Sequence, residues 1–387
     1  MEKQKICIIG GGLSGLVTAI SLSKTNCDID FITGSNKRKN TSNRTVAISQ
    51  DNFEFLKKLN IFKSIKKDLW PCQEMKIYNE KNNKSLLETF QLSDKKNHKN
   101  LLYMLENSKF EKLMIDEIKK NKSITLKKNI SVKKVFDAGI LKGIKINNKI
   151  KKYNLIVICT GNNSALIKNL FHEECIENSY GEKSITTILN HSSLNNNIAR
   201  QIFLNNEIFA LLPISNTKTS IVWSVKKNIY EKSNTLIKNK IMIYASNFIK
   251  KIKFATPLEY RDLNFLIRNQ YYKNRILLFG DALHSVHPLA GQGFNMILRD
   301  LTFLEKILKD KIRLGLDVGS ISTLSEFTKK TKVKNFVYSF GIDLIKKNFS
   351  LEKKYLKELR SNILKVANKN VLLKEVLFNI ANKGIRL

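Results

Sequence analysis

The residues of this chain that could do chemistry gather in two glycine-rich turns. The first turn is Gly10-Gly11-Gly12-Leu13-Ser14-Gly15, which has the spacing G-x-G-x-x-G. In that spacing Gly10 permits a tight turn, Gly12 lets a pyrophosphate approach the backbone, and Gly15 lets a helix pack closely on a strand. A helix that begins here offers free N–H groups and the positive end of its dipole to phosphates. The turn therefore predicts a dinucleotide site.

The flanking residues support that interpretation, with one exception. The run at 6–9 is typical of a buried strand and the run at 16–22 of a helix, so the turn lies between a strand and a helix. An acidic residue normally ends the next strand, here 28–32, and binds a ribose. Thr33 stands at that position. A hydroxyl can still bind the ribose, but without charge assistance.

The second turn spans 275–300 and contains Gly280, Asp281, Gly291 and Gly293. A strand at 276–279 ends in the turn, where Asp281 offers a carboxylate to sugar-alcohol hydroxyls. The two later glycines let the backbone approach a flat ring, and a helix from about 293 to 308 directs its positive end toward that ring. Such a dipole stabilises negative charge on a reduced cofactor.

Composition limits the function classes. The chain has 387 residues, of which 42% are hydrophobic, and a formal charge of +35. That charge would suit nucleic acid or anionic lipid. Lys and Asn are scattered along the whole chain together with Ile, as an A- and T-rich coding bias would produce. Neither zinc-finger spacing nor an RNA-binding aromatic signature is present, so we predict no nucleic-acid partner.

Cysteine usage and the N-terminus point to one compartment. The five cysteines are odd in number and form no C-x-x-C pair, which predicts reduced thiols. No apolar run reaches the ~20 residues that span a bilayer. The first residues lead directly into a strand and leave no room for a signal peptide. We therefore expect a cytoplasmic protein.

Periodicity predicts the elements between the two turns. We expect helices at 45–68 and 106–120 and a mostly helical chain after 308. Strands are expected at 74–90, 124–126, 132–135 and 155–159, and a strand-rich sheet at 180–225. Strand–helix–strand units predict a parallel sheet, and the central strands predict a second, mostly antiparallel layer, giving an α/β fold.

The second turn closely resembles the flavin-ribityl motif of single-component FAD-dependent aromatic hydroxylases. Further segments resemble the ubiquinone-biosynthesis branch of that family, so the resemblance covers nearly the whole chain. They are 44–49, 101–107, 180–191, 209–214, 220–224 and 381–384. The resemblance implies a Rossmann-like FAD/NAD(P)-binding domain of the p-hydroxybenzoate-hydroxylase type (1–75, 101–168 and 266–325). It also implies an inserted substrate-binding β-sheet domain (76–100 and 169–265) and a C-terminal helical segment (326–387).

The resemblance also implies roles for single residues. Arg44 would lie beside the FAD, although a surface arginine in a basic loop is the alternative. Val132 would meet the adenine through its backbone, or else be a plain core valine. Trp223 resembles part of the substrate sheet, with core packing as its simpler role. The remaining implied cofactor-binding residues are Leu13, Ser14, Asn107, Thr160, Gly161, Gln292, Phe294 and Asn295, and His287 and Pro288 would lie near the ring.

Two positions depart from the family pattern. In a middle motif the family carries an Asp-Gly pair tied to FAD and to the nicotinamide donor, and this chain has Thr160 before Gly161. After Asn107 the family often has an arginine, and this chain has Ser108. His284 and His287 have H-x-x-H spacing but no third ligand nearby, so no metal is predicted.

The implied reaction is hydroxylation of the aromatic ring of a polyprenylated phenol in ubiquinone biosynthesis. NAD(P)H would reduce the FAD, O₂ would add to it, and a flavin hydroperoxide would transfer the oxygen, so no protein nucleophile or base is assigned. Alternatives on the same fold are a prenyl reductase, a halogenase and an FAD-binding scaffold subunit. The amphipathic stretch 371–380 could contact anionic lipid, a partner in a biosynthetic complex, or its own domain.

Overall fold

A parallel sheet forms from strands taken from most of the length of the chain. Its order is β19 (Tyr272–Lys273), β20 (Ile276–Leu278), β12 (Leu155–Ile158), β1 (Lys5–Ile9), β2 (Asp28–Ile32) and β8 (Ile124–Lys127). Only β19 is antiparallel to its neighbour. The computed structural model describes residues 3–34, 42–80, 85–93, 100–146, 149–162, 164–171, 175–204, 206–349 and 367–384.

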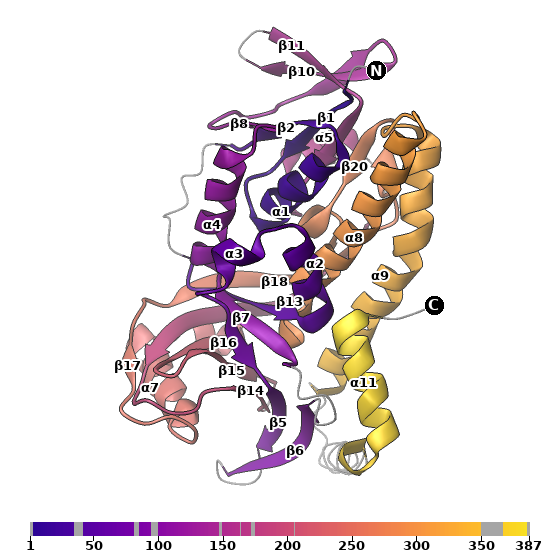
Figure 1. Cartoon of the computed structure of the whole chain (residues 1–387). Helices are drawn as coiled ribbons and strands as arrows, with labels where there is room; N and C mark the ends of the chain where they lie inside the picture. Colours follow the sequence, from indigo (N-terminus) through magenta and orange to yellow (C-terminus); the bar gives the residue numbers. More distant parts are fainter. Residues whose placement is uncertain are drawn as a thin grey trace.

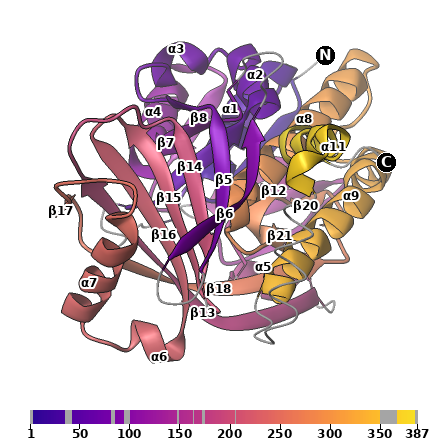
Figure 2. The same cartoon turned by 90° about the horizontal axis from the view of Figure 1, so that it is seen from below.

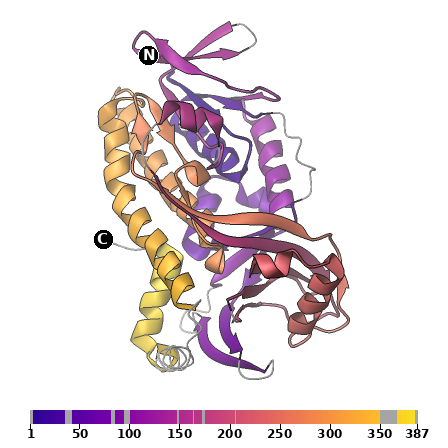
Figure 3. The ribbon, with the colours of Figure 1, turned by 180° about the vertical axis from the view of Figure 1, so that it is seen from behind.

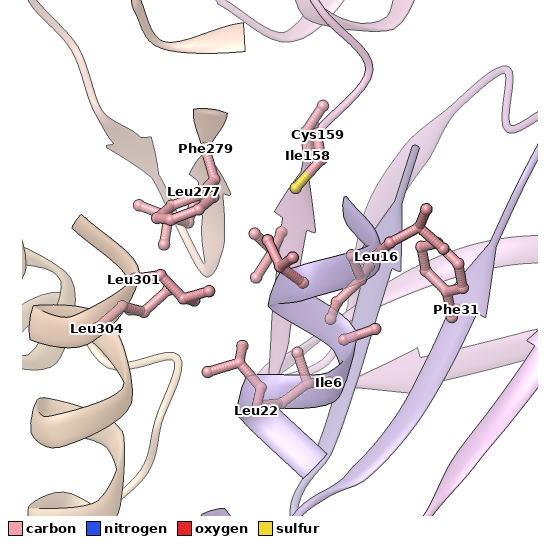
Figure 4. Packing of buried hydrophobic residues seen from close by; sticks show 14 of the residues in the cluster. Ile6, Leu16, Leu22, Phe31, Ile158, Cys159, Leu277, Phe279, Leu301 and Leu304 are labelled. Atoms are coloured by element: carbon pink, nitrogen blue, oxygen red, sulfur yellow. The ribbon is translucent and has the colours of Figure 1, made fainter. Parts of the chain in front are cut away.

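Helices cover this sheet because its central strands are apolar throughout. Every residue of β12 is buried, which requires cover on both faces. The main helices nearby are α1 (Leu13–Leu22), α4 (Asn107–Lys120), α8 (Gln292–Arg313) and α9 (Ile321–Phe349). Figure 4 shows Leu16 and Leu22 of α1 and Leu301 and Leu304 of α8 in the core beside Ile158 and Leu277 of the sheet.

The second layer is a larger sheet that is antiparallel at all but one pairing of its main path. Its order is β21 (His284–Ser285), β18 (Glu259–Arg268), β13 (Cys175–Asn190), β16 (Lys218–Lys226), β15 (Ile208–Ser215), β14 (Ile198–Phe203), β5 (Glu74–Glu80) and β6 (Leu86–Ser93), with β17 (Lys253–Phe254) beside β13. Strands β14 and β5 are parallel. The helices α6 (Lys227–Tyr230) and α7 (Asn234–Ala245) lie at one side of this sheet (Figure 2).

Long strands join the two layers. Figure 3 shows β13 and β18 running from the helix-covered parallel sheet into the antiparallel sheet. One end of their pairing, Cys175 with Arg268, lies close to the parallel sheet, because β20 begins only eight residues after β18 ends. A bulge between Ser179 and Glu182 interrupts the register. These strands tie the position of one sheet to that of the other.

Two three-stranded sheets and the remaining helices complete the chain. The sheets are β3 (Thr45–Ser49), β7 (Leu102–Glu106) and β4 (Trp70–Cys72), and β11 (Lys149–Tyr153), β10 (Leu141–Ile146) and β9 (Val135–Ala138). The other helices are α2 (Gln50–Lys58), α3 (Phe62–Ile65), α5 (Ala165–Leu170) and α11 (Val371–Lys383), and α9 and α11 lie side by side at the outside of the molecule (Figure 1).

The structure confirms the α/β fold and corrects two local predictions. The predicted helix at 45–68 begins only at Gln50, because the β-branched residues before it pair with β7 as strand β3. The predicted strand at 132–135 is also wrong, since the strand begins at Val135 and Val132 precedes it. Among the described residues no helix combines the length and apolar character that crossing a bilayer requires. All five cysteines are free thiols.

Candidate functional site

Three turns from distant parts of the chain meet at one edge of the parallel sheet. Strand β1 leads into Gly10, β12 leads into Cys159 and Thr160, and β20 leads toward Gly280. Because β1, β12 and β20 are parallel neighbours, their carboxyl ends lie at the same edge. Ligands of such sheets bind in the crevice outside the carboxyl ends of the strands.

The first turn is shaped by contacts that only glycine permits. Gly10 has φ +131°, and a Cβ there would lie 2.4 Å from the carbonyl oxygen of Cys159. A Cβ on Gly15 would lie 1.9 Å from the carbonyl oxygen of Gly10. Helix α1 therefore packs against the turn at a distance that excludes any side chain.

Gly12 has the opposite environment. It immediately precedes α1, and no atom of the described residues lies within 4 Å of the position that its Cβ would take. Open space in front of a helix N-terminus is what a pyrophosphate requires, because the first N–H groups of the helix remain available to it. This observation fits a dinucleotide at the turn.

The second turn touches the first. Gly280 has φ +67°, and a Cβ there would lie 2.7 Å from the Cβ of Ser14. Further along, Gly291 has φ +64°, and its Cβ would lie 2.7 Å from that of Ala47 in β3. The structure therefore brings the two glycine turns together and places β3 against the second one.

Arg44 and Asp281 share the electrostatic environment of this edge. Desolvation lowers the pKa of Arg44, as does the nearby Arg261, whereas Asp281 and Glu259 act to raise it. Arg44 nevertheless has an exposed side chain. Arg44, just before β3, and Asp281, in the second turn, are therefore close enough for their charges to interact at this edge.

The chain that leads into β3 is fixed to the antiparallel sheet by a carboxylate. The backbone N–H of Asn43 donates to Oε2 of Glu259 at 2.8 Å, and Nε of Arg261 lies 2.9 Å from Oε1. Burial alone would raise the pKa of Glu259, but these two bonds outweigh burial and lower it. The sequence did not predict the roles of Glu259 and Arg261 in β18, since the alternation of polar and apolar residues in a strand does not indicate which groups its polar side chains contact.

Arg268 links the middle motif to the second turn. Its Nε donates to the carbonyl oxygen of Ala282 at 2.9 Å, and Nη2 reaches the carbonyl oxygen of Asn162 at 3.4 Å. Thr160 is exposed beside this link, and Gly161 has φ +83°. The arginine therefore positions the loop in which Thr160 replaces the acid of the family. Sequence reasoning missed it as well.

The start of α8 is held by side-chain hydrogen bonds. Oδ1 of Asn295 accepts from the N–H of Ser49 and from Nδ2 of Asn52, while its own Nδ2 donates to Ala47 and Gly291 carbonyls. Asn295 is fully buried, so its side chain has no polar atom left for a ligand.

The neighbouring residues of α8 are also engaged by the protein. Oε1 of Gln292 accepts a hydrogen bond from Tyr338 at 2.6 Å, and the Phe294 ring packs edge-on against Phe110 at 5.8 Å. Asn107, at the start of α4, is buried, and its N–H donates to the carbonyl oxygen of Arg44 at 2.8 Å. The side chain of Asn107 is engaged as well, since its Nδ2 donates to Oε1 of Glu111 at 3.2 Å. The backbone of Asn107 thus holds the chain before β3, and the side chain of Gln292 ties the start of α8 to α9.

Both histidines of the second turn are buried and face carboxylates. Nε2 of His284 lies 3.0 Å from Oδ2 of Asp300. Nε2 of His287 lies 3.6 Å from Glu182, whose other oxygen is 2.8 Å from Nζ of Lys346 in α9. Burial lowers the pKa of His287, against the pull of Glu182. Across the described residues, no three His, Cys, Asp or Glu side chains are grouped to hold a metal ion. Pro288 follows as a half-buried residue before the turn into α8.

A cavity of about 190 Å³ lies at the other end of the first turn. It is lined by residues of α1, β2, α4 and β8 and of the loops that follow the two strands, among them Gly11, Thr33, Gly34, Lys128 and Asn129. Thr33 therefore lines a cavity beside the turn, where the sequence places a ribose ligand. Val132 is not part of this lining and packs against the main core.

Comparison with known proteins decides the family. A sequence model of the FAD binding domain matches residues 3–315. The chain belongs to this FAD-binding family. It is 23% identical to the ubiquinone biosynthesis monooxygenase COQ6, mitochondrial, of Dictyostelium discoideum, over 97% of this chain and 90% of that protein. It is 20% identical to the ubiquinone hydroxylase UbiM of Neisseria meningitidis, over 96% and 83% of the two chains. The resemblance inferred from the sequence is confirmed.

Solved structures of the FAD-binding family share this fold. HpxO of Klebsiella pneumoniae, complexed with FAD and uric acid, superposes with a TM-score of 0.78 at 13% identity and covers 98% of this chain and 96% of its own. The p-nitrophenol 4-monooxygenase PnpA of Pseudomonas putida superposes with a TM-score of 0.74 at 14% identity, with full coverage of both chains. At these identities the likeness is one of fold.

Proposed function

We propose that this FAD-binding protein is a monooxygenase that hydroxylates the aromatic ring of a polyprenylated phenol in ubiquinone biosynthesis. The observation that carries the proposal is the contact between the two glycine turns, where a Cβ on Gly280 would collide with Ser14. One extended cofactor can then meet both turns. The match to FAD-binding proteins and the names of the full-length relatives support this reading.

The residues present fit an FAD. Gly12 leaves the N-terminus of α1 open for the pyrophosphate, Thr33 lines the cavity at the adenosine end, and Asp281 offers its carboxylate to the ribityl hydroxyls. Arg44 would supply positive charge beside the cofactor. The backbones of Gly291 and Gly293 would approach the flavin ring, with His287 and Pro288 nearby, and the N-terminal end of α8 would stabilise negative charge there.

An apolar wall stands beside the second turn and suits a prenyl tail. Val286 and Leu289 of that turn pack with Ile77 and Ile208 of the antiparallel sheet. A second apolar cluster lies between this sheet and β3, β7 and β4, and it includes Leu212, Ile214 and Met104. Each buried CH₂ of a prenyl chain contributes about 0.8 kcal/mol, so such walls favour a long apolar substrate.

The chemistry needs no protein nucleophile. Bound FAD would supply the redox step, in which the ring C–H, O₂, NAD(P)H and a proton yield the ring C–OH, water and NAD(P)⁺. The chain would bind and orient the ring, exclude water and hold the turns through Glu259 and Arg268. NAD(P)H as the donor is part of the proposal. Thr160 replaces the family's acid in the motif tied to donor use.

Two further parts of the proposal concern organisation. We assign 1–75, 101–168 and 266–325 to FAD binding, 76–100 and 169–265 to substrate binding, and 326–387 to a C-terminal helical segment. We also propose that α11 touches anionic lipid or a biosynthetic partner, since Leu373, Val376 and Leu377 are exposed beside lysines.

The test uses purified holoprotein with a polyprenylated phenol, NADH or NADPH, and ¹⁸O₂. We expect one equivalent of bound FAD, bleaching of its absorbance by the nicotinamide, and a product heavier by one ¹⁸O atom. FAD that is not bleached with any phenol precursor present would favour the scaffold alternative, and reduction of a prenyl double bond without ¹⁸O would favour the prenyl reductase. Deleting the gene in its host should accumulate a quinone precursor that lacks one hydroxyl group.

A further inference from the structure

A groove of about 760 Å³ lies between α2, α8, α9 and the end of α11. It shares no lining residue with the FAD site assigned above. Its volume falls within the range of ligand pockets, which is about 300 to 1,000 Å³. The hydroxylation reaction gives this groove no role.

Cations without a carboxylate partner line the groove from four helices. None of these five side chains forms an ion pair with a described residue: Lys58 of α2, Arg299 and Lys306 of α8, Lys334 of α9 and Lys383 of α11. The groove also has five acidic side chains, and these are occupied. Asp300 accepts from Asn335 at 2.8 Å, and Glu305 accepts from Ser21 at 2.6 Å and Lys309 at 2.5 Å.

The other acids also have partners. Glu54 is paired with Lys57 at 2.9 Å and Asp310 with Arg313 at 3.7 Å, while Asp51 accepts from Asn382 at 3.2 Å. Asp51 and Asp300 have no lysine or arginine partner among the described residues, so five unpaired cations face two unpaired carboxylates and positive charge is in excess. Because the cations approach from several helices, they surround a volume rather than form one exposed stripe.

Arg299 has a buried donor that an anion in the groove could satisfy. Its guanidinium carbon lies 4.4 Å from the centroid of the Tyr338 ring. Its Nη1 is buried and has no hydrogen-bond partner in the described part of the chain. A Cβ on Gly384 would lie 2.9 Å from this nitrogen, so the glycine makes room for it. Buried polar atoms are nearly always satisfied, and a charged donor without an acceptor is costly.

Part of the groove is apolar. Phe55, Met296 and Phe303 line it, next to the neutral polar side chains of Asn52 and Thr302. A ligand with an anionic head and an apolar chain could therefore place its head at Arg299 and its chain against Phe55 and Phe303.

We propose that this groove binds the phosphate group of an anionic phospholipid, with the acyl chain against Phe55 and Phe303. A phosphate offers several oxygens to Arg299 and the surrounding lysines at once. The site is independent of the hydroxylase proposal, because its residues and its ligand differ from those of the FAD site.

Calorimetric titration of the FAD-loaded protein tests the site. Dihexanoyl phosphatidylglycerol below its micelle concentration should bind, and both dihexanoyl phosphatidylcholine and inorganic phosphate should bind at least about tenfold more weakly. Lys306→Gln and Arg299→Gln should each weaken phosphatidylglycerol binding about fivefold, since each basic residue near an anionic lipid contributes about 1 kcal/mol. FAD content and melting temperature of Lys306→Gln should not change, because Lys306 is exposed.

Lys151→Gln is the matched control, since Lys151 is an exposed lysine of β11 outside the groove. It should leave the affinity unchanged. Equal binding of inorganic phosphate and phosphatidylglycerol would overturn the lipid assignment and leave an adventitious ion only. An equal loss in Lys151→Gln and Lys306→Gln would show that net charge, not the groove, attracts the lipid. If the protein prefers phosphatidylglycerol to phosphatidylcholine when the lipids are soluble but not when they are in vesicles, the ligand is a single lipid extracted from the membrane.

Discussion

The two main sheets of the molecule present their functional groups in different ways. In the parallel sheet the turns after β1, β12 and β20 meet because parallel strands end at one edge. In the antiparallel sheet neighbouring strands end at opposite edges, and its polar groups that reach the turns and the chain before β3, namely Glu259, Arg261 and Arg268, lie along one strand, β18. The parallel edge is organised by backbone contacts, and the antiparallel sheet by side-chain hydrogen bonds.

This difference decides what a substitution can do. At the packed glycines of the parallel edge, Gly10 and Gly15, the essential property is the absence of a side chain, so one added methyl group there should remove cofactor binding and stability together. In the antiparallel sheet the core and the groups that contact the turns are different residues, so stability and binding should respond to different substitutions. Four predictions test this contrast.

Trp223→Ala should give the largest loss of stability. Trp223 is fully buried in the antiparallel sheet, and its Nε1 donates to Glu207 at 3.0 Å. Truncation of a buried aromatic side chain costs about 3 to 5 kcal/mol. Urea unfolding measures this loss. Trp223→Phe is the control and should lose only about 1 kcal/mol, the value of one hydrogen bond. Equal losses would assign the effect to Glu207 rather than to packing.

Gly15→Ala should lower the free energy of unfolding by about 3 kcal/mol and abolish FAD binding. Overpacking usually costs about 1 to 3 kcal/mol, and a clash with backbone that cannot move belongs at the upper end of that range. The added Cβ would lie 1.9 Å from the carbonyl oxygen of Gly10. Gly12→Ala is the matched control, since the added Cβ would meet no atom within 4 Å in the part of the chain that the structure describes. It should keep the melting temperature and lose only FAD affinity. A normal melting temperature for Gly15→Ala would contradict the packing argument.

Asp281→Asn should weaken FAD binding about tenfold, since a hydrogen bond from a charged group contributes about 1.5 kcal/mol or more. Stability without FAD should stay within about 0.5 kcal/mol, because Asp281 is exposed. Fluorescence titration of the apoprotein with FAD measures the affinity. Asp262→Asn, an exposed carboxylate of β18, controls for the change in charge. Unchanged FAD affinity in Asp281→Asn would move the ribityl contact to another residue.

Much of the parallel edge could be predicted from the sequence, and the reason is local. The clash between Gly15 and Gly10 involves residues five positions apart, so the G-x-G-x-x-G spacing carries it directly. Strand β3 was harder to predict, because the spacing of the apolar residues Val46, Ile48 and Phe53 fits the periodicity of a strand and also that of a helix. Only its pairing with β7, more than fifty residues later, decides between them.

The contacts of β18 could not be predicted at all. Arg268 reaches the carbonyl oxygens of Ala282 and Asn162, and the second of these lies more than a hundred residues away. Because every residue has a backbone carbonyl, the residue types at positions 282 and 162 do not indicate that Arg268 binds there. The unpaired cations of the groove were hidden for the same reason, since the chain contains 68 lysines and arginines and only the fold shows which of them lack a partner.

Glu259→Gln should give the smallest effect, and one that depends on pH. Hydrogen bonds from Asn43 and Arg261 lower the pKa of Glu259 in the folded state below the value of 4.5 expected when unfolded. A depressed carboxyl pKa stabilises the fold above the unfolded value, and this contribution disappears as the pH falls through the folded value. Glu259 is partly exposed, so the loss at pH 7 should be below about 1 kcal/mol. Urea unfolding at pH 7 and at pH 3 measures it. The difference between wild type and Glu259→Gln should be smaller at pH 3 than at pH 7, whereas Asp262→Asn should show no such pH dependence. If the free energies of unfolding of wild type and Glu259→Gln differ by the same amount at both pH values, the charge of Glu259 does not hold the chain before β3. The link between that chain and β18 would then depend only on the shape of the Glu259 side chain.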